Sequence, residues 1–491
     1  MNRNKLLTQN EAQTTFWESY NFTLSVKVLL ISFIIAVSGC KSAKNFDKTL
    51  SLKEVEESKM DDLENKRFKI AKPILNWWES LEDKQLDALI SKSLTNNKDV
   101  SIAIANLFKA RQVTSESRFD RFPAVTANGS YRRTHFSQEV GFVNAANANN
   151  ADIGFDASWE IDLFGRVSER IKANVALENS AQSNLRNMYV VISSEVSRGY
   201  IELRGAQYRL DIAKRNVENQ TETFKLTEKL TNGGIGTRID ILRAKTQLET
   251  TKSTIPALKA EISANINRLS VLTGQVPNAL KSELTSSKPL PTIPSQVNIG
   301  NVADLLKRRP DILIAKNDLK AAIANYNVSI KDQFPTVNIV GAIGFAATTF
   351  SNIGATALNA FAGPSVSWSA FDLGRIQAQI HQKDAEAQIA VAFYEKTVLE
   401  SLEDLQTSIS NFSREEETRE RLKKAAIFSK EAALLAKIRY EAGVDTFIDV
   451  LESEGTLLAT EDALAVSEIN SALNLISIYK ALGGGWEVKK K

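Results

Sequence analysis

Few side chains of this 491-residue chain are of the types that carry out chemistry. It has one cysteine, Cys40, and two histidines, His135 and His381. A single cysteine excludes an intrachain disulfide and a thiolate metal cluster, and three methionines provide no ladder of thioether ligands. Glu160 and Asp162 are the best candidates for a pair of acid–base carboxylates. Both carboxylates lie on the polar face of an alternating stretch, which explains them without catalysis. We therefore expect no metal site, no catalytic residue and no enzyme.

Cys40 suits a different chemistry, covalent attachment of lipid. The apolar run 28–37 ends on two small residues directly before this cysteine, and it is shorter than the ~20 residues of a membrane-spanning helix. A short apolar core that closes on small residues is typical of a secretory signal, and the cysteine after it resembles a bacterial lipobox. We expect a lipoprotein signal peptide over 1–39 and a lipidated N-terminal segment over 40–72. The alternative is a buried core cysteine behind an ordinary signal.

The elements that must position Glu160 and Asp162 occur twice in the chain, as four recurring landmarks show. The residue number rises by the same amount, 212, from Asp99 to Asp311 and from Pro123 to Pro335. It rises by 209 from Gly165 to Gly374 and from Gly234 to Gly443. Constant spacing is typical of rigid helices, whereas loops tolerate insertions. We predict repeat 1 over 73–280, a Pro/Ser linker over 281–300, repeat 2 over 301–482 and a tail over 483–491.

Within each repeat, one stretch alternates apolar and polar residues with a period of two. The pattern predicts strands at about 123–132 and 151–162 in repeat 1, and at about 335–345 and 357–371 in repeat 2. A half-buried strand of a soluble sandwich would show the same alternation. Strands of about ten residues with one apolar and one polar face are also typical of a membrane barrel.

The polar face of the second strand carries acidic residues. Asp156, Glu160 and Asp162 alternate with apolar neighbours, so we expect them to face the water-filled lumen of such a barrel. Four strands cannot close a barrel, and lipid tolerates no open sheet edge. If these strands span a membrane, several copies of the chain must pool them.

Two stretches are too long for the helices of a globular domain. Residues 167–231 and 376–442 contain no proline, and some 65 helical residues would extend for about 97 Å. Shorter helices are expected to return over 239–272 and 447–482. Apolar residues at steps of three, four or seven predict a packed helix seam, and these are Val196, Tyr200, Leu203, Ala206, Leu210, Ala213, Val217 and Phe224.

Taken together, these features resemble the TolC-like outer-membrane efflux proteins, in particular the lipoprotein branch that serves tripartite RND-type systems. The landmarks, Arg309-Pro310-Asp311 and the closing run 483–486 carry the resemblance. It implies an α+β membrane protein, a homotrimer with a 12-stranded β-barrel, four strands per chain, continued by an α-helical coiled-coil barrel. Lys41 follows Cys40 in place of the aspartate that is associated with lipoproteins retained at the inner membrane, so the lipobox resemblance favours a lipid anchor in the outer membrane. The family resemblance implies that the protein extends from there into the periplasm.

The resemblance also implies a function and partners. The chain would be a passive exit channel for drugs, toxic compounds or metal ions, working with a periplasmic adaptor, an inner-membrane pump and outer-membrane lipid. The lipid on Cys40 would be its only bound group. A formal net charge of +3, from 61 basic and 58 acidic residues, gives no case for a nucleic-acid partner.

Candidate gate and docking residues follow from the same resemblance. Asp449 and Glu452 match acidic ring positions, and Asp240 and Tyr440 match partners of a closing link. Asp445 stands where the family often has a basic linking residue. The alternative for Asp240 and Asp449 is a purely local role in the first turn of a helix. The breaks between helices would expose docking residues for the adaptor, and these are Gly234, Thr237, Gly443 and Thr446.

Two other functions remain open from the sequence. One is an exit channel for type I protein secretion. The other is a lipid-anchored coiled-coil scaffold without a pore, which would explain the helices but not the duplicated strands. The chain does not name its exported compound, since the pump largely selects it.

Overall fold

The computed structural model describes residues 67–71, 76–135, 148–299 and 308–486. The predicted signal peptide 1–39, Cys40 and most of the segment 40–72 lie outside these ranges. Among the described residues, no helix combines the length and the apolar character needed to cross a membrane.

The same order of helix, two strands, long helix and shorter helix occurs twice, preceded in the first set by η1 and α3 and with η3 and η4 between the strands of the second. The first set is η1 (Trp77–Leu81), α3 (Lys84–Asn96), α4 (Lys98–Phe119), β2 (Ala124–Thr134), β3 (Ala148–Ile161), α5 (Arg166–Asn232) and α6 (Arg238–Leu272). The second is α9 (Pro310–Lys331), β5 (Thr336–Ala347), η3 (Phe350–Asn352), η4 (Ala355–Ala357), β6 (Leu358–Ser367), α10 (Leu373–Glu441) and α11 (Phe447–Ala481). The first offset of the sequence, 212, relates both ends of α4 to those of α9, and the second, 209, relates both ends of α6 to those of α11.

Between the two sets, the linker is more structured than its proline and serine content suggests. It contains the single-turn helix α7 (Lys281–Leu284) and the short strand β4 (Val297–Ile299). β4 pairs in parallel with β1 (Phe68–Ile70). This small sheet ties the start of the described chain to the segment between the repeats.

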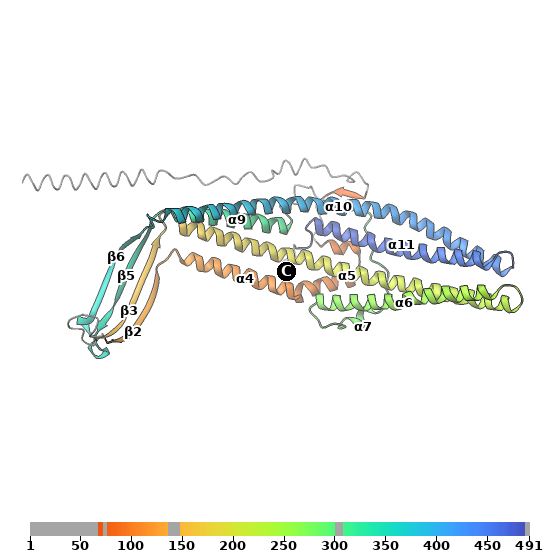
Figure 1. The fold of residues 1–491 in the computed structure, drawn as a ribbon, viewed down its shortest axis with the longest axis horizontal. Coiled ribbons are helices and arrows are strands. Elements are labelled where there is room, and N and C mark those ends of the chain that lie inside the picture. Colours follow the sequence, from red (N-terminus) through yellow and green to blue (C-terminus); the bar gives the residue numbers. More distant parts are fainter. Residues whose placement is uncertain (1–66, 72–75, 136–147, 300–307, 487–491) are drawn as a thin grey trace, which may run out of the picture. The chain divides into compact units, whose positions relative to one another are not determined.

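The larger sheet has four antiparallel strands in the order β2-β3-β5-β6 (Figure 1). Each repeat contributes one hairpin, and the β3–β5 pair joins the two hairpins. Gly154 lies opposite Gly344 in that pair, and a Cβ on Gly154 would come within 2.8 Å of the Gly344 Cα. A side chain at either glycine would therefore clash with the backbone of the opposite strand, so the two repeats can approach this closely only with glycine at both positions.

The prediction that the fourth strand extends to residue 371 was wrong, because β6 ends at Ser367. After that residue the chain turns into α10, and the Trp368 indole donates to the Gln333 carbonyl at 3.0 Å. Trp159 makes the equivalent bond to the Arg121 carbonyl, also at 3.0 Å. The serine–tryptophan alternation around Trp368 resembles a strand in sequence, but β6 ends at Ser367, which pairs with Thr336, the first residue of its partner strand β5.

The two long helices extend from the sheet and return through shorter partners. α5 has 67 residues and α10 has 69, which corresponds to a length of about 100 Å each. α6 packs beside α5, and α11 packs beside both α10 and α5. Figure 1 shows the two turns that join these helices at the end of the bundle opposite the strands.

The main core lies midway along the long helices, where α3, η1 and the linker pack against them. Trp77 stacks on Tyr479 with 5.0 Å between ring centroids, and Tyr200 and Leu203 of the predicted seam are fully buried. From Val196 to Ala213 the predicted apolar seam is confirmed. Nearer the turns Val217 and Phe224 are half-buried, and Phe224 packs against a smaller apolar cluster around Tyr440 and Phe447. The fully buried positions of α5 there are polar, and these are Asn216, Gln220, Thr223 and Thr227.

Candidate gate, docking and lumen residues

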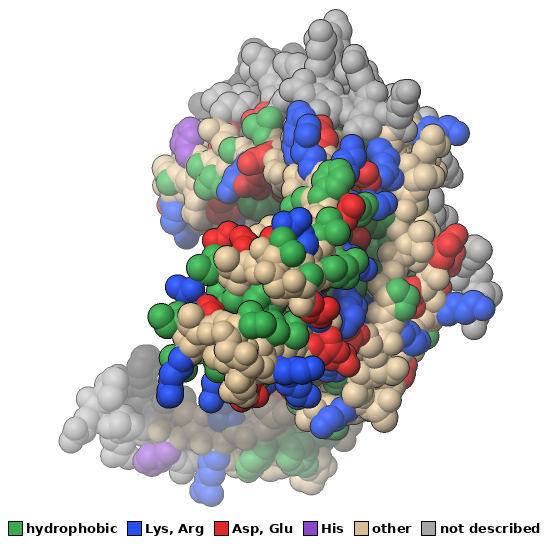
Figure 2. All heavy atoms as spheres, turned by 90° about the vertical axis from the view of Figure 1, so that its right-hand side faces the viewer, with side chains coloured by type: hydrophobic (Ala, Val, Ile, Leu, Met, Phe, Trp, Pro, Cys, Tyr) green, Lys and Arg blue, Asp and Glu red, His purple; other side chains and the backbone are tan. Residues whose placement is uncertain are grey.

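The turns at the ends of the long helices have the same backbone hydrogen bonds. After α5, Gly234 has φ +86° and Ile235 N–H donates to the Leu230 carbonyl at 2.9 Å. After α10, Gly443 has φ +69° and Val444 N–H donates to the carbonyl of Arg439, also at 2.9 Å. This is the Schellman arrangement that ends helices at a left-handed residue. Charged side chains of both signs surround hydrophobic ones on this end of the molecule (Figure 2).

Each returning helix begins with a capping box. The Asp240 carboxylate accepts from Thr237 N–H at 2.9 Å and from its hydroxyl at 2.7 Å. Asp449 does the same with Thr446, at 2.9 and 2.7 Å. Bonds from the Thr446 hydroxyl and backbone N–H lower the pKa of Asp449. Within a single chain, both acids therefore have the local capping role that the sequence left as the alternative.

The predicted link between Asp240 and Tyr440 is not formed in the described part of the chain. Tyr440 is buried against Phe447, with ring centroids 5.8 Å apart, and its hydroxyl has no hydrogen-bond partner among the described residues. Asp445 pairs with Arg439 of its own turn through bonds of 2.7 and 2.8 Å. This pairing explains how an acid is accommodated at the position where the family often has a base.

Glu452 lies one turn after Asp449 and is exposed. The docking candidates Gly234, Thr237, Gly443 and Thr446 are exposed as well. All four lie at or beside the two turns, which leaves them accessible to a partner at the end of the helices.

A polar seam between α5 and α11 was missed by the sequence-based interpretation. Thr223 donates to the Glu454 carboxylate at 2.6 Å, and Asn216 donates to Glu461 at 3.1 Å. Burial raises the pKa of Glu454, while the bond from Thr223 and the charge of Lys437 oppose the rise. The signal in the sequence was the spacing of Asn216, Gln220, Thr223 and Thr227, which places polar residues on one helix face.

The acids of the second strand have different environments. Asp156 of β3 is exposed and accepts a hydrogen bond from Asn128 across the hairpin. Glu160, near the end of the strand, accepts from Arg166 at 3.1 and 2.5 Å. The placement of Asp162 on the strand was wrong, because β3 ends at Ile161.

Asp162 caps the long helix. Its two carboxylate oxygens accept from the backbone N–H groups of Val167 and Ser168 at 2.9 and 2.8 Å. Burial opposes ionisation, but hydrogen bonds from Ser168 and Val167 outweigh it, so the pKa of Asp162 is lowered. The orphan N–H groups of a helix N-terminus attract a carboxylate in this way, a competing use that alternation in the sequence does not reveal.

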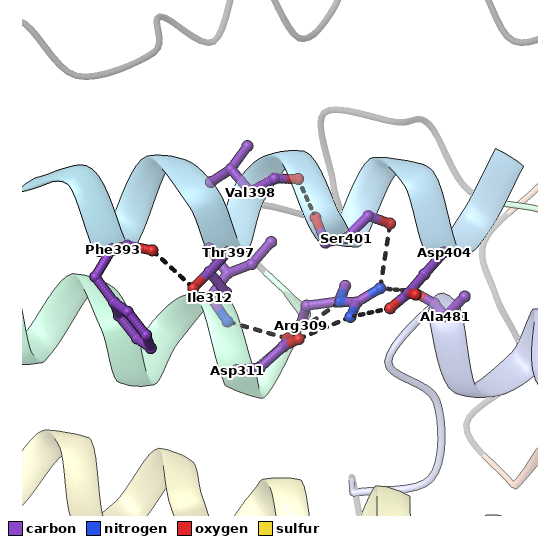
Figure 3. Close-up of polar contacts among 9 residues, drawn as sticks. All are labelled: Arg309, Asp311, Ile312, Phe393, Thr397, Val398, Ser401, Asp404 and Ala481. Atoms are coloured by element: carbon purple, nitrogen blue, oxygen red, sulfur yellow. Dashed lines mark hydrogen bonds and ion pairs between the residues drawn. The ribbon is translucent and has the colours of Figure 1, made fainter.

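Arg309 joins three helices of repeat 2 (Figure 3). Its guanidinium donates to both oxygens of Asp311 on α9, at 3.1 and 2.7 Å, and to Asp404 on α10 at 3.1 Å. Nη1 donates to the backbone carbonyls of Ser401, at 3.2 Å, and Ala481, at 3.1 Å. The Arg-Pro-Asp motif thus has a structural role that its sequence did not indicate.

The chain matches the model of the outer membrane efflux protein family over residues 89–275 and 301–484. It is 26% identical over 424 residues to the toluene efflux pump outer membrane protein TtgC of Pseudomonas putida, with 84% of this chain and 85% of the relative covered. Outer membrane protein OprJ of Pseudomonas aeruginosa is 26% identical over 423 residues, with 84% and 87% covered. A solved structure of the outer-membrane channel OprN has a TM-score of 0.85 at 35% identity, covering 91% of this chain and 100% of that one.

The matches cover both repeats and include the strands and the long helices. The predicted α+β class, the family and the outer-membrane localisation are confirmed. The chain therefore belongs to the outer membrane efflux protein family and acts as an efflux channel of the outer membrane.

Proposed function

We propose that three copies of this chain form one exit channel of a tripartite efflux system. The observation that carries this proposal is the four-stranded sheet, whose outer strands β2 and β6 each have only one neighbour within the described residues. A sheet in lipid needs every backbone group paired, so only a closed barrel satisfies it. Twelve strands from three chains close such a barrel, and the long helices continue it into the periplasm.

The channel works with a periplasmic adaptor and an inner-membrane pump, and it conducts small toxic compounds passively. The names of the relatives support this substrate class, because they describe efflux of toluene, of solvents and of antibiotics. Export of proteins by a type I system is the second candidate. A pump and adaptor reconstituted with the channel would distinguish the two by the compound that crosses.

The chain performs no catalysis of its own. Glu160 and Asp162, the strongest acid–base candidates, are engaged in an ion pair with Arg166 and in a helix cap. Asp156 and Glu160 line the wet face of the strands, where the exposed carboxylate of Asp156 favours cations in the lumen.

Cys40 carries a covalent lipid that anchors each copy in the outer membrane. Cells supplied with labelled palmitate are expected to label the wild-type chain and not the Cys40→Ala variant. Label that persists in the variant would place the lipid elsewhere.

The gate lies at the ends of the helices. Asp449 and Glu452 of three copies form acidic rings around the axis, while Asp240 and Tyr440 are partners of a closing link. Gly234, Thr237, Gly443 and Thr446 contact the adaptor. Like charges brought together on a symmetry axis bind cations and resist closure unless they are neutralised.

The whole proposal is tested in planar bilayers and on gels. Protein extracted in mild detergent is expected to migrate as a heat-sensitive trimer and to give stepwise conductance. A stable monomer without conductance would contradict the channel assembly.

A further inference from the structure

A groove close to the strand-to-helix junction carries more positive than negative charge. It lies between α5 and α9, has a volume of about 550 Å³ and is reached by Arg121, which precedes β2. The buried residues that line it are apolar, and these are Ile171, Ala176 and Ala324. Its charged lining residues are three cations and one acid, and these are Arg121, Lys172, Lys320 and Glu169.

Two of these cations have no ion-pair partner among the described residues. The side chains of Arg121 and Lys320 form neither an ion pair nor a hydrogen bond there. Lys172 neutralises the one acid, since its ammonium lies 2.6 Å from the Glu169 carboxylate. The charge of Asp162 acts on Arg121, but both oxygens of that carboxylate accept from the backbone of α5. The groove therefore keeps positive charge that the described chain leaves available to an anion.

The duplicated architecture does not require these charges. The offsets of 212 and 209 relate the three cations to uncharged residues of the other repeat, and these are Gln333, His381 and Phe108. Charges that served the packing common to both repeats would recur in both. The cations of the groove therefore have a role that one repeat has and the other lacks.

The strands show at which level and on which side the groove begins. Trp159 belongs to the apolar face of β3, opposite to the face of Glu160, and its indole donates to the Arg121 carbonyl at 3.0 Å. Further aromatic side chains are exposed at the ends of the strands, and these are Phe122, Trp368 and Phe371. Aromatic residues are enriched where lipid headgroups meet water. The groove thus begins at the membrane interface, on the apolar side of the sheet.

The face of α5 supports the same side. Lys172, Asn179 and Arg186 follow each other at steps of seven residues, which places them on one face of the helix. The Arg186 guanidinium lies over the ring of Trp486, 4.6 Å from its centroid. The C-terminal segment therefore packs on this face further along the helix. Because a channel must keep its lumen open, the face that carries this segment is the outer one.

We propose that this groove binds the headgroup of an anionic phospholipid from the periplasmic leaflet of the outer membrane. Arg121 and Lys172 bind its phosphate, as arginine and lysine commonly do, and Lys320 adds a further charge at the end of a long, flexible stem. A free phosphate ion would leave the apolar base of the groove uncovered, whereas the carbon atoms of a headgroup cover it. The inference rests on the proposed channel, with its strands in the membrane and its helices in the periplasm, and it adds a lipid site to it.

Lipid retention tests the site. The full-length protein is placed in nanodiscs with equal amounts of phosphatidylglycerol and phosphatidylcholine that have the same acyl chains, and native mass spectrometry counts the lipids that stay bound. We expect the wild type to retain phosphatidylglycerol preferentially. The triple variant Arg121→Gln, Lys172→Gln, Lys320→Gln is expected to lower that preference by about tenfold or more, because each basic residue near an anionic lipid contributes about fivefold.

A matched control removes the same net charge elsewhere. Lys109, Arg118 and Lys316 are exposed on α4 and α9 and do not line the groove. Their combined replacement by Gln is expected to keep the wild-type preference. A control that loses the preference as fully as the groove variant would assign it to general surface charge and overturn the site.

A single variant makes the test independent of how the triple variant folds. Lys320→Gln breaks no side-chain contact of the described chain, and it is expected to lower the preference by about fivefold. An unchanged preference in this variant, in protein that migrates like the wild type, would remove Lys320 from the site and contradict the proposed headgroup contacts.

Two further arms identify the ligand and separate the site from the channel. Excess inorganic phosphate is expected to leave the bound phosphatidylglycerol in place, and displacement would assign the groove to free phosphate instead of lipid. Conductance of the wild-type protein in planar bilayers tests the channel by itself. A conducting wild type without preference for phosphatidylglycerol would overturn the lipid site and leave the channel intact.

Discussion

Arg309 donates a hydrogen bond of 3.1 Å to the backbone carbonyl of Ala481, which ties the start of α9 to the last turn of α11. Repeat 1 makes the same connection with a smaller side chain. Asn97, the repeat 1 counterpart of Arg309, donates to the Leu272 carbonyl at 3.0 Å, and Leu272 is the last residue of α6. The tie is thus a property of the duplicated architecture, and repeat 2 extends it with Asp404 on α10.

Replacement of Arg309 should destabilise the helical bundle. Arg309→Met removes the donors of two buried carbonyls, Ser401 and Ala481, and each unsatisfied group costs about 1–3 kcal/mol. We expect the free energy of unfolding to fall by roughly 2–4 kcal/mol, measured by denaturant titration of the detergent-solubilised protein. Arg414→Met, which removes an exposed arginine paired with Glu417, is the control and should change it by less than about 1 kcal/mol.

Glu454 should make stability depend on pH. Because burial raises its pKa, the folded chain binds this proton more tightly than the unfolded chain, and stability falls as pH rises from the ordinary value of about 4.3 through the raised one. Glu454→Gln keeps an acceptor for Thr223 and removes the charge. We expect it to raise the thermal unfolding midpoint by a few degrees at pH 7.5 and to have no effect at pH 3.5.

Glu431 is exposed on α10, the helix that packs beside α11, and it provides the control for that experiment. Glu431→Gln should leave the midpoint unchanged at both pH values. A Glu454→Gln variant that is less stable than the wild type at pH 7.5 would mean that the carboxylate is required in its charged form.

The two capping aspartates allow the gate and the cap to be separated. Asp449→Asn and Asp240→Asn alter equivalent capping boxes, so their effects on helix stability should match. Only Asp449 belongs to the proposed acidic ring. We expect Asp449→Asn to lower the ratio of cation to anion permeability in planar bilayers, while Asp240→Asn leaves it near the wild-type value. Equal changes in both variants would assign Asp449 to capping alone.

Gly443 and Gly455 should respond to alanine in opposite directions. Gly443 has φ +69° at the turn after α10, where an L side chain costs roughly 1–2 kcal/mol. Gly455 lies within α11, and a Cβ there would meet no atom within 4 Å. We expect Gly443→Ala to destabilise the turn and Gly455→Ala to stabilise the helix by up to about 1 kcal/mol, measured by hydrogen exchange of the neighbouring amides. Stabilisation by Gly443→Ala would contradict the left-handed turn.

The sequence by itself determined the elements and their duplication. Strands, long helices and repeats could be predicted because each depends on the periodicity and spacing of residues that are close together in the chain. Such local patterns can be read directly from the sequence. The family motif and the positions of the turns at Gly234 and Gly443 were accessible for the same reason, since a glycine after a long periodic run is a local signal.

Tertiary structure alone decided how the polar groups are used. Asp162 continued the strand pattern, yet its carboxylate caps α5, and Trp368 continued it as well, although its indole binds the Gln333 carbonyl. Arg309 could be recognised as part of a motif, but its partners on α10 and α11 lie 95 and 172 residues away. Hydrogen bonds and ion pairs depend on which donors and acceptors meet in space, and periodicity along the chain does not specify those meetings.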